Sequence, residues 1–123
     1  MRKLYEPKPG GRIDQAALVR AIQINHQIGR LLTGLADLDP SPRNRQLMVA
    51  MRLAVTNQAE RLHWLQDPAE SPRAALADNQ QLRRLTWLLL ENEPTPTQVA
   101  YLGTIAEVLG EQSQQLLRIE EIR

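Results

Sequence analysis

Apolar residues recur every three or four positions along four long stretches of this chain, and this spacing is typical of amphipathic helices. In the first stretch the repeating positions are Ala17, Ala21, Ile24, Ile28, Leu31, Leu35 and Leu38. The other three stretches continue the same alternation of three and four. The pattern predicts helices over residues 14–38, 41–66, 71–91 and 95–121.

Three proline-containing links separate these stretches: Asp39-Pro40-Ser41-Pro42, Asp67-Pro68-Ala69-Glu70-Ser71-Pro72 and Glu93-Pro94-Thr95-Pro96. The first proline of each link disfavours helical geometry in the acid before it. The hydroxyl residue can cap the next helix, and the second proline suits the first helical position. We therefore expect Ser41, Ser71 and Thr95 to be N-caps, and Asp14 to cap the first helix.

Helices of about 20–27 residues joined by short links favour antiparallel neighbours. The expected fold is all-α, an antiparallel up-down-up-down four-helix bundle in a single domain over residues 13–123. Residues 1–12 contain Pro7, Pro9, Gly10 and Gly11 and should form a short extended basic arm. The links resemble one another, whereas the helices after them do not, so no solenoid repeat is predicted.

The composition suits helix-on-helix packing, because the apolar residues are almost all aliphatic and include no Phe. The absence of Cys excludes disulfides and thiolate metal sites. No apolar run is long enough to span a membrane, and the N-terminus has no signal-peptide core. These features lead us to expect a cytoplasmic protein with no membrane association.

Few residues offer catalytic chemistry. Glu60 and His63 have the Glu-x-x-His spacing of ferritin-like di-metal sites, but such sites need a second copy of the motif and further glutamates. Arg20 and His26 have a spacing similar to the Arg-x₄₋₆-His motif of helical HEPN-type ribonucleases, but the periodicity places them on different sides of their helix. No phosphate-binding loop or nucleophile motif occurs. We predict no enzyme activity, no metal and no cofactor.

Each row of apolar residues spaced three and four apart forms a seam along its helix. Polar residues interrupt these seams at Gln58 and Asp78, and Asn25 lies at the edge of a seam. A buried carboxylate must be paired or protonated, so Asp78 should meet an arginine such as Arg20 or Arg52. We expect a structural role for Asp78, because polar seam residues can fix register and partner choice. Proton chemistry in a pocket around Asp78 is the lesser alternative.

The fourth helix also carries small residues along one strip, at Gly103, Ala106, Gly110 and Ser113. Glycine inside a helix costs up to about 1 kcal/mol relative to alanine. The strip therefore predicts close packing of another helix backbone.

Apolar residues on the flanks of the second and third helices indicate a second buried contact. The candidate protein interface consists of Leu53, Trp64, Leu76, Trp87 and Leu90. Tryptophan is a common interface hot spot, and C2 homodimers are the commonest oligomers. The favoured function is thus a non-enzymatic protein-interaction module (a subunit, adaptor or regulator) that forms a homo-oligomer through these faces.

Nucleic-acid binding is the alternative. Its candidate contacts are Arg2, Lys3, Lys8, Arg12, Arg43, Arg45 and Arg52. Such a basic arm and arginine stripe could bind a phosphate backbone without reading bases. The competing explanation is a solvated face whose charges complement Glu107, Glu111, Glu120 and Glu121 on the fourth helix.

Overall fold

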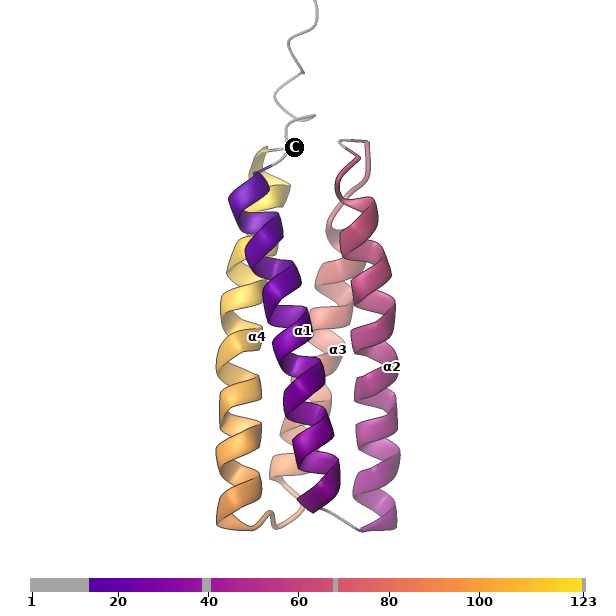
Figure 1. The fold of residues 1–123 in the computed structure, drawn as a ribbon, viewed down its shortest axis with the longest axis vertical. Coiled ribbons are helices and arrows are strands. Elements are labelled where there is room, and N and C mark those ends of the chain that lie inside the picture. Colours follow the sequence, from indigo (N-terminus) through magenta and orange to yellow (C-terminus); the bar gives the residue numbers. More distant parts are fainter. Residues whose placement is uncertain (1–13, 39–40, 68, 123) are drawn as a thin grey trace, which may run out of the picture.

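Four antiparallel helices lie side by side in the computed structural model, which describes residues 14–38, 41–67 and 69–122 (Figure 1). They are α1 (Gln15–Leu38), α2 (Pro42–Trp64), α3 (Arg73–Leu90) and α4 (Pro96–Ile122). The described ranges contain no strand. The predicted four-helix fold is confirmed, with helix ends within one or two residues of expectation. None of the described helices combines the length and the apolar character needed to cross a bilayer.

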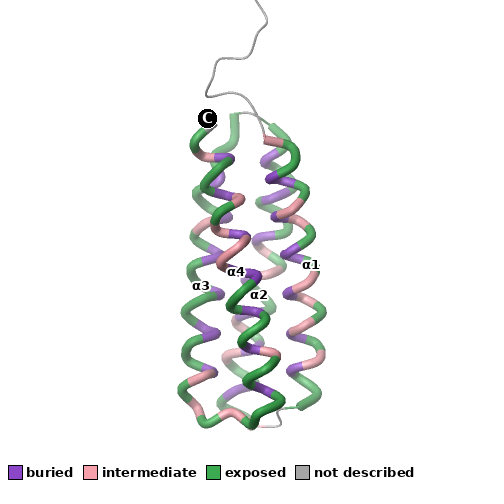
Figure 2. Tube along the Cα trace, turned by 90° about the vertical axis from the view of Figure 1, so that its left-hand side faces the viewer, coloured by how far each residue is buried: buried purple, intermediate pink, exposed green. Residues whose placement is uncertain are grey.

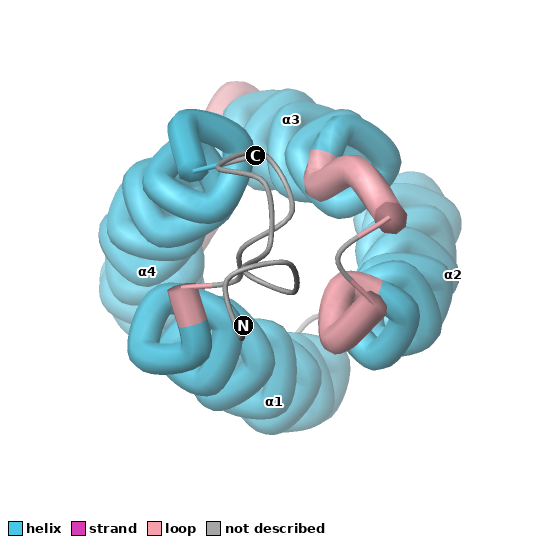
Figure 3. Tube along the Cα trace, turned by 90° about the horizontal axis from the view of Figure 1, so that it is seen from above, coloured by secondary structure: helices cyan, strands magenta, loops and turns pink. Residues whose placement is uncertain are grey.

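The helices follow one another around a ring when the bundle is seen from its end (Figure 3). α1 packs against α2 and α4, and α3 packs against α2 and α4. Short links between antiparallel neighbours produce this order directly. Consequently α1 begins, α2 ends and α4 ends at the same end of the bundle (Figure 1).

Local capping fixes the starts of three helices as predicted. Asp14 Oδ1 accepts a hydrogen bond of 2.9 Å from the amide three residues on. Ser41 has an extended backbone and its hydroxyl accepts from the Asn44 amide. Thr95 and Gln98 form a capping box, with reciprocal bonds of 3.2 and 2.7 Å between each side chain and the other's amide.

The predicted cap at Ser71 is wrong. α3 begins at Arg73, and Pro72 occupies the N-cap position without a side-chain hydrogen bond. Ser71 lies one residue before this position, and its Oγ accepts a hydrogen bond from the Arg73 amide at 3.2 Å. The second link is longer than the other two, and a turn closed by the Glu70 amide on the Asp67 carbonyl takes up the extra residues.

The buried face of every helix points toward the bundle axis (Figure 2). Buried apolar side chains form two clusters along this axis. The larger is built around Ile24, Ile28, Met51, Leu82, Ile105 and Leu109. The smaller, at the end where α1 begins, contains Ala17, Leu18, Ala21, Leu62, Leu65, Ala75, Leu116 and Ile119.

Candidate functional site

A ring of four carboxamides crosses the core between the two apolar clusters. Each helix contributes one amide, namely Asn25, Gln58, Asn79 and Gln112, and none is more than 3% exposed. Each NH₂ group donates a bond of 2.9–3.0 Å to a main-chain carbonyl of the following helix, in the order Val55, Ala75, Leu109 and Ala21. The last bond returns from α4 to α1, so the circuit is closed.

Side-chain bonds join the same amides to one another. Gln58 and Gln112 face each other across the bundle and exchange two bonds of 2.9 Å. Asn25 and Asn79 each donate to the nearer glutamine oxygen, at 2.9 and 3.0 Å. Because both NH₂ hydrogens of every amide have an acceptor, the network offsets the cost of burying these groups.

Two of the four ring residues, Gln58 and Asn25, were predicted as polar residues at or beside the apolar seams, whereas Asn79 and Gln112 were not predicted. Gln112 lies three residues after Leu109 on the seam of α4, so continuing that seam would have found it.

The residues of the ring, and the links at Asp39 and Glu93, repeat with a period of two helices. Asn25 and Gln58 are 33 residues apart, as are Asn79 and Gln112. The bonds from the two asparagines to main-chain carbonyls both span 30 residues. Gln58 and Gln112 differ by 54, and the same shift carries Asp39-Pro-Ser-Pro onto Glu93-Pro-Thr-Pro. A comparison of single helices does not reveal these matching positions, because the repeating unit is a pair of antiparallel helices, a helical hairpin.

Asp78 is buried on α3 and pairs with Arg61, not with the predicted Arg20 or Arg52. Arg61 Nε lies 3.4 Å from Asp78 Oδ2, and the Asp78 side chain is 12% exposed. Burial raises the pKa of Asp78, and the charge of Arg61 opposes that shift only in part. Arg20 is unsuited because it faces α4, where it bonds both oxygens of Glu111 and lowers the pKa of that carboxyl.

The outer face of α2 carries an exposed apolar stripe. Val49 is 67% exposed, Leu53 61% and Trp64 56%. The spacings of four and eleven residues place all three on one side of the helix, over about 22 Å at 1.5 Å per residue. Asn57 and Glu60 lie on the same side of α2 between Leu53 and Trp64, so the stripe consists of three apolar side chains with polar positions between them.

The other three predicted interface residues lie elsewhere. Leu76 and Leu90 are partly buried and pack against the bundle's own core clusters. Trp87 is 66% exposed but belongs to the end of the bundle where α3 finishes, opposite to Trp64. The predicted five-residue interface thus divides, and Leu53 and Trp64 share the outer face of α2.

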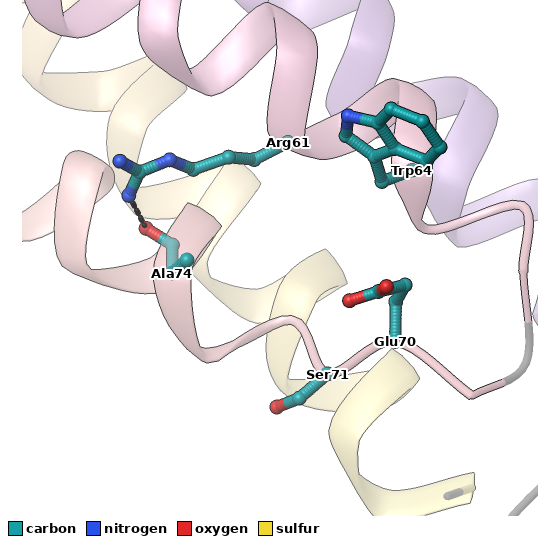
Figure 4. Close-up of a pocket in the computed structure, with 5 residues that line it drawn as sticks. All are labelled: Arg61, Trp64, Glu70, Ser71 and Ala74. Atoms are coloured by element: carbon teal, nitrogen blue, oxygen red, sulfur yellow. Dashed lines mark hydrogen bonds between the residues drawn. The ribbon is translucent and has the colours of Figure 1, made fainter.

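An open pocket of about 300 Å³ lies beside Trp64, between α2 and the start of α3 (Figure 4). Its lining residues are Arg61, Trp64, Glu70, Ser71 and Ala74. Arg61 extends from α2 toward α3 at one side of the pocket and donates to the Ala74 carbonyl at 3.4 Å. The pocket is therefore lined by the Trp64 ring, by the Arg61 guanidinium, which a hydrogen bond holds in place, and by the Glu70 carboxylate.

A second pocket, of about 220 Å³, lies in the groove between α1 and α2. It is lined by Ile22, Asn25, His26, Ala59, Leu62, His63 and Gln66. These residues include both histidines of the sequence. His63 also meets Trp64 edge-on, with ring centroids 5.8 Å apart. His26 and Arg20 do not converge, as the sequence predicted, because Arg20 turns toward α4.

The predicted arginine stripe is only partly within the structure. Arg43, Arg45 and Arg52 are exposed on α2, whereas Arg2, Lys3, Lys8 and Arg12 lie outside the described residues. Acidic residues of α4 bind other partners: Glu111 pairs with Arg20, and Glu120 lies 3.6 Å from Arg73. α2 and α4 occupy opposite corners of the ring, so these acids do not complement the α2 arginines.

The two glycines of the small-residue strip on α4 are not closely packed against another helix of the described chain. A Cβ atom added at Gly103 or Gly110 would meet nothing within 4 Å. The expectation of close helix packing there is wrong for the described chain. The close approach occurs at Gly34 instead, where an added Cβ would lie 2.7 Å from the Tyr101 ring.

Across the described ranges, no group of three or more His, Cys, Asp or Glu side chains is arranged to hold a metal ion. Comparison with known proteins gives no further identification: no protein-family model, curated protein or solved structure matches this chain.

Proposed function

We propose that this chain is a non-enzymatic protein-interaction module that self-associates through the outer face of α2. The observation that carries the proposal is the exposed stripe of Val49, Leu53 and Trp64. A bundle helix needs one apolar face for its own core, and α2 carries three further large apolar side chains on its outer side. Exposed aromatic and aliphatic side chains in one row are typical of the buried centre of an interface.

A second copy of the chain suits this stripe. Trp64 and Leu53 are eleven residues apart on the same side of α2. A two-fold axis midway between them would run two α2 helices antiparallel and place each Trp64 on the Leu53 of the other copy. The arrangement is self-complementary, because each copy supplies both the large aromatic group and the aliphatic surface that covers it.

Sedimentation and light scattering over a range of concentrations test this proposal. We expect a dimer whose dissociation constant rises at least tenfold on Trp64→Ala, which a loss of about 1.4 kcal/mol would produce. Leu53→Glu should have at least the same effect. Trp87→Ala is the matched control, since Trp87 is also more than half exposed but lies at the other end of the bundle. Far-UV circular dichroism would verify that every variant stays folded.

A strict monomer at high concentration would contradict self-association. Equal weakening by Trp64→Ala and Trp87→Ala would contradict the assignment to the α2 face.

Nucleic-acid binding is a second candidate, favoured by the exposure of Arg45 and Arg52. They are seven residues apart on α2, so they share a face, and they pair with no acid in the described part of the chain. Binding through these residues should weaken steeply with salt and fall on Arg45→Glu with Arg52→Glu. A shift assay with DNA and RNA that stays blank at low salt would eliminate this candidate.

A further inference from the structure

We propose that the pocket between α1 and α2 binds a small uncharged molecule that has an apolar body and one N–H or O–H donor. This site is separate from the α2 stripe, and it follows from three properties of the pocket: an acceptor that no described residue uses, a lining without Asp, Glu, Lys or Arg, and a difference between the two halves of the chain.

The unused acceptor is Asn25 Oδ1. Asn25 is 3% exposed and its NH₂ group is fully engaged, with the Val55 carbonyl at 3.0 Å and Gln58 Oε1 at 2.9 Å. Those two acceptors fix which end of the amide is nitrogen. The remaining Oδ1 accepts no hydrogen bond from any described residue, although Asn25 lines the pocket. A donor inside the pocket would satisfy it.

The lining of the pocket contains no carboxylate, lysine or arginine. Ile22, Ala59 and Leu62 supply apolar walls, and Gln66 adds an amide at the rim. A bound cation would lose its hydration here without gaining a carboxylate, whereas an uncharged donor can bond Asn25 Oδ1 without that cost.

The two histidines line the pocket from different levels along the bundle axis. Relative to the bonded pair Asn25 and Gln58, His26 is one residue further along α1 and His63 is five residues further along α2. Because the helices are antiparallel, these offsets add to about 9 Å at 1.5 Å per residue. Both imidazoles line the pocket, and their ring nitrogens offer further hydrogen bonds to a ligand there.

The other half of the chain lacks this arrangement. A shift of 54 residues carries Asn25 onto Asn79, whose Oδ1 is also unpartnered but buried from solvent. The same shift carries His26 onto Gln80, Ala59 onto Ser113 and His63 onto Leu117. The ring is thus common to both hairpins, whereas the open acceptor and its histidines belong to the first hairpin alone.

Phenol and toluene are suitable probes, since they have similar shapes and only phenol carries a donor. In ¹H–¹⁵N spectra of the full chain, phenol should shift the side-chain amide of Asn25 and the signals of His26 and His63. We expect toluene to bind at least about tenfold more weakly, because it would leave Asn25 Oδ1 unpaired. Equal affinity for the two probes would overturn the proposal, and so would an absence of shifts with phenol.

Ala59→Leu provides a blocking variant that leaves the amide ring intact. Ala59 is exposed on α2 and lines the pocket, so a leucine there should fill the space and reduce phenol affinity at least tenfold. Ser113→Leu at the equivalent position of the second hairpin is the matched control and should leave affinity unchanged. Retained binding in Ala59→Leu would overturn the proposal. Tight binding of Zn²⁺ alone to both histidines would also overturn it, since the pocket would then be a metal site.

Discussion

Replacing Gln112 by leucine tests whether the amide ring stabilises the bundle. Gln112 takes part in four hydrogen bonds: two exchanged with Gln58, one from Asn79 and one to the Ala21 carbonyl. At about 1 kcal/mol net for each bond, the loss is about 4 kcal/mol. The greater apolar burial of leucine offsets about 1–2 kcal/mol of it. We expect Gln112→Leu to lower the free energy of unfolding by about 2–3 kcal/mol.

A double-mutant cycle with Gln58→Leu isolates the contact between the two glutamines. Each single variant loses the two bonds that they exchange, but the double variant loses them only once. The double variant should therefore be less destabilised than the sum of the singles by about 1–2 kcal/mol. Urea titrations followed by circular dichroism measure all four proteins. Combining Gln112→Leu with Thr95→Ala, at the far end of the bundle, is an additive control.

Additivity of the two glutamine variants within about 0.5 kcal/mol would refute the reasoning. The glutamines would then not exchange hydrogen bonds in solution, and the ring would not be a single cooperative unit.

Three further predictions concern stability. Burial raises the pKa of Asp78, so the contribution of Asp78 to stability is complete at low pH and is lost as the pH rises through that raised pKa. Asp78→Asn should flatten this part of the stability–pH profile, and an unchanged profile would contradict the prediction. Gly103→Ala should stabilise the protein by up to about 1 kcal/mol in thermal unfolding, whereas Gly34→Ala should destabilise it because the added methyl group would contact Tyr101. Equal effects of the two variants would contradict the difference in space around the two glycines. Thr95→Ala should cost about 1 kcal/mol through loss of the capping box, and a neutral result would show that the cap is dispensable.

The helices could be predicted because their signals are local. Apolar spacing depends on residues three and four apart, and the cap at Thr95 involves only its own first turn. The cap at Ser71 was misplaced because the longer link closes an extra turn that proline and hydroxyl positions do not specify. Local chemistry thus predicts the helices better than the links between them.

The candidate sites depend on how the helices are aligned with one another along the bundle axis, and no local sequence pattern specifies that alignment. Gln58 and Gln112 meet only because α2 and α4 pack with those residues at one level. His26 and His63 share a pocket for the same reason, although their helical periodicity alone places them near solvent. Exposure of Leu53 and Trp64 was predictable from the seam of α2, but the burial of Leu76 required the neighbouring core cluster.

The direction of the hydrogen bonds in the amide ring has a consequence for topology. Four antiparallel helices with short links can be arranged clockwise or anticlockwise, and an apolar seam packs in either arrangement. The amides donate in one sense, from α1 to α2, α3, α4 and back to α1. In the opposite arrangement Asn25 would point away from α2, and its buried NH₂ group would lose the Val55 carbonyl. The ring therefore selects the handedness of the bundle, a choice that its apolar residues leave open.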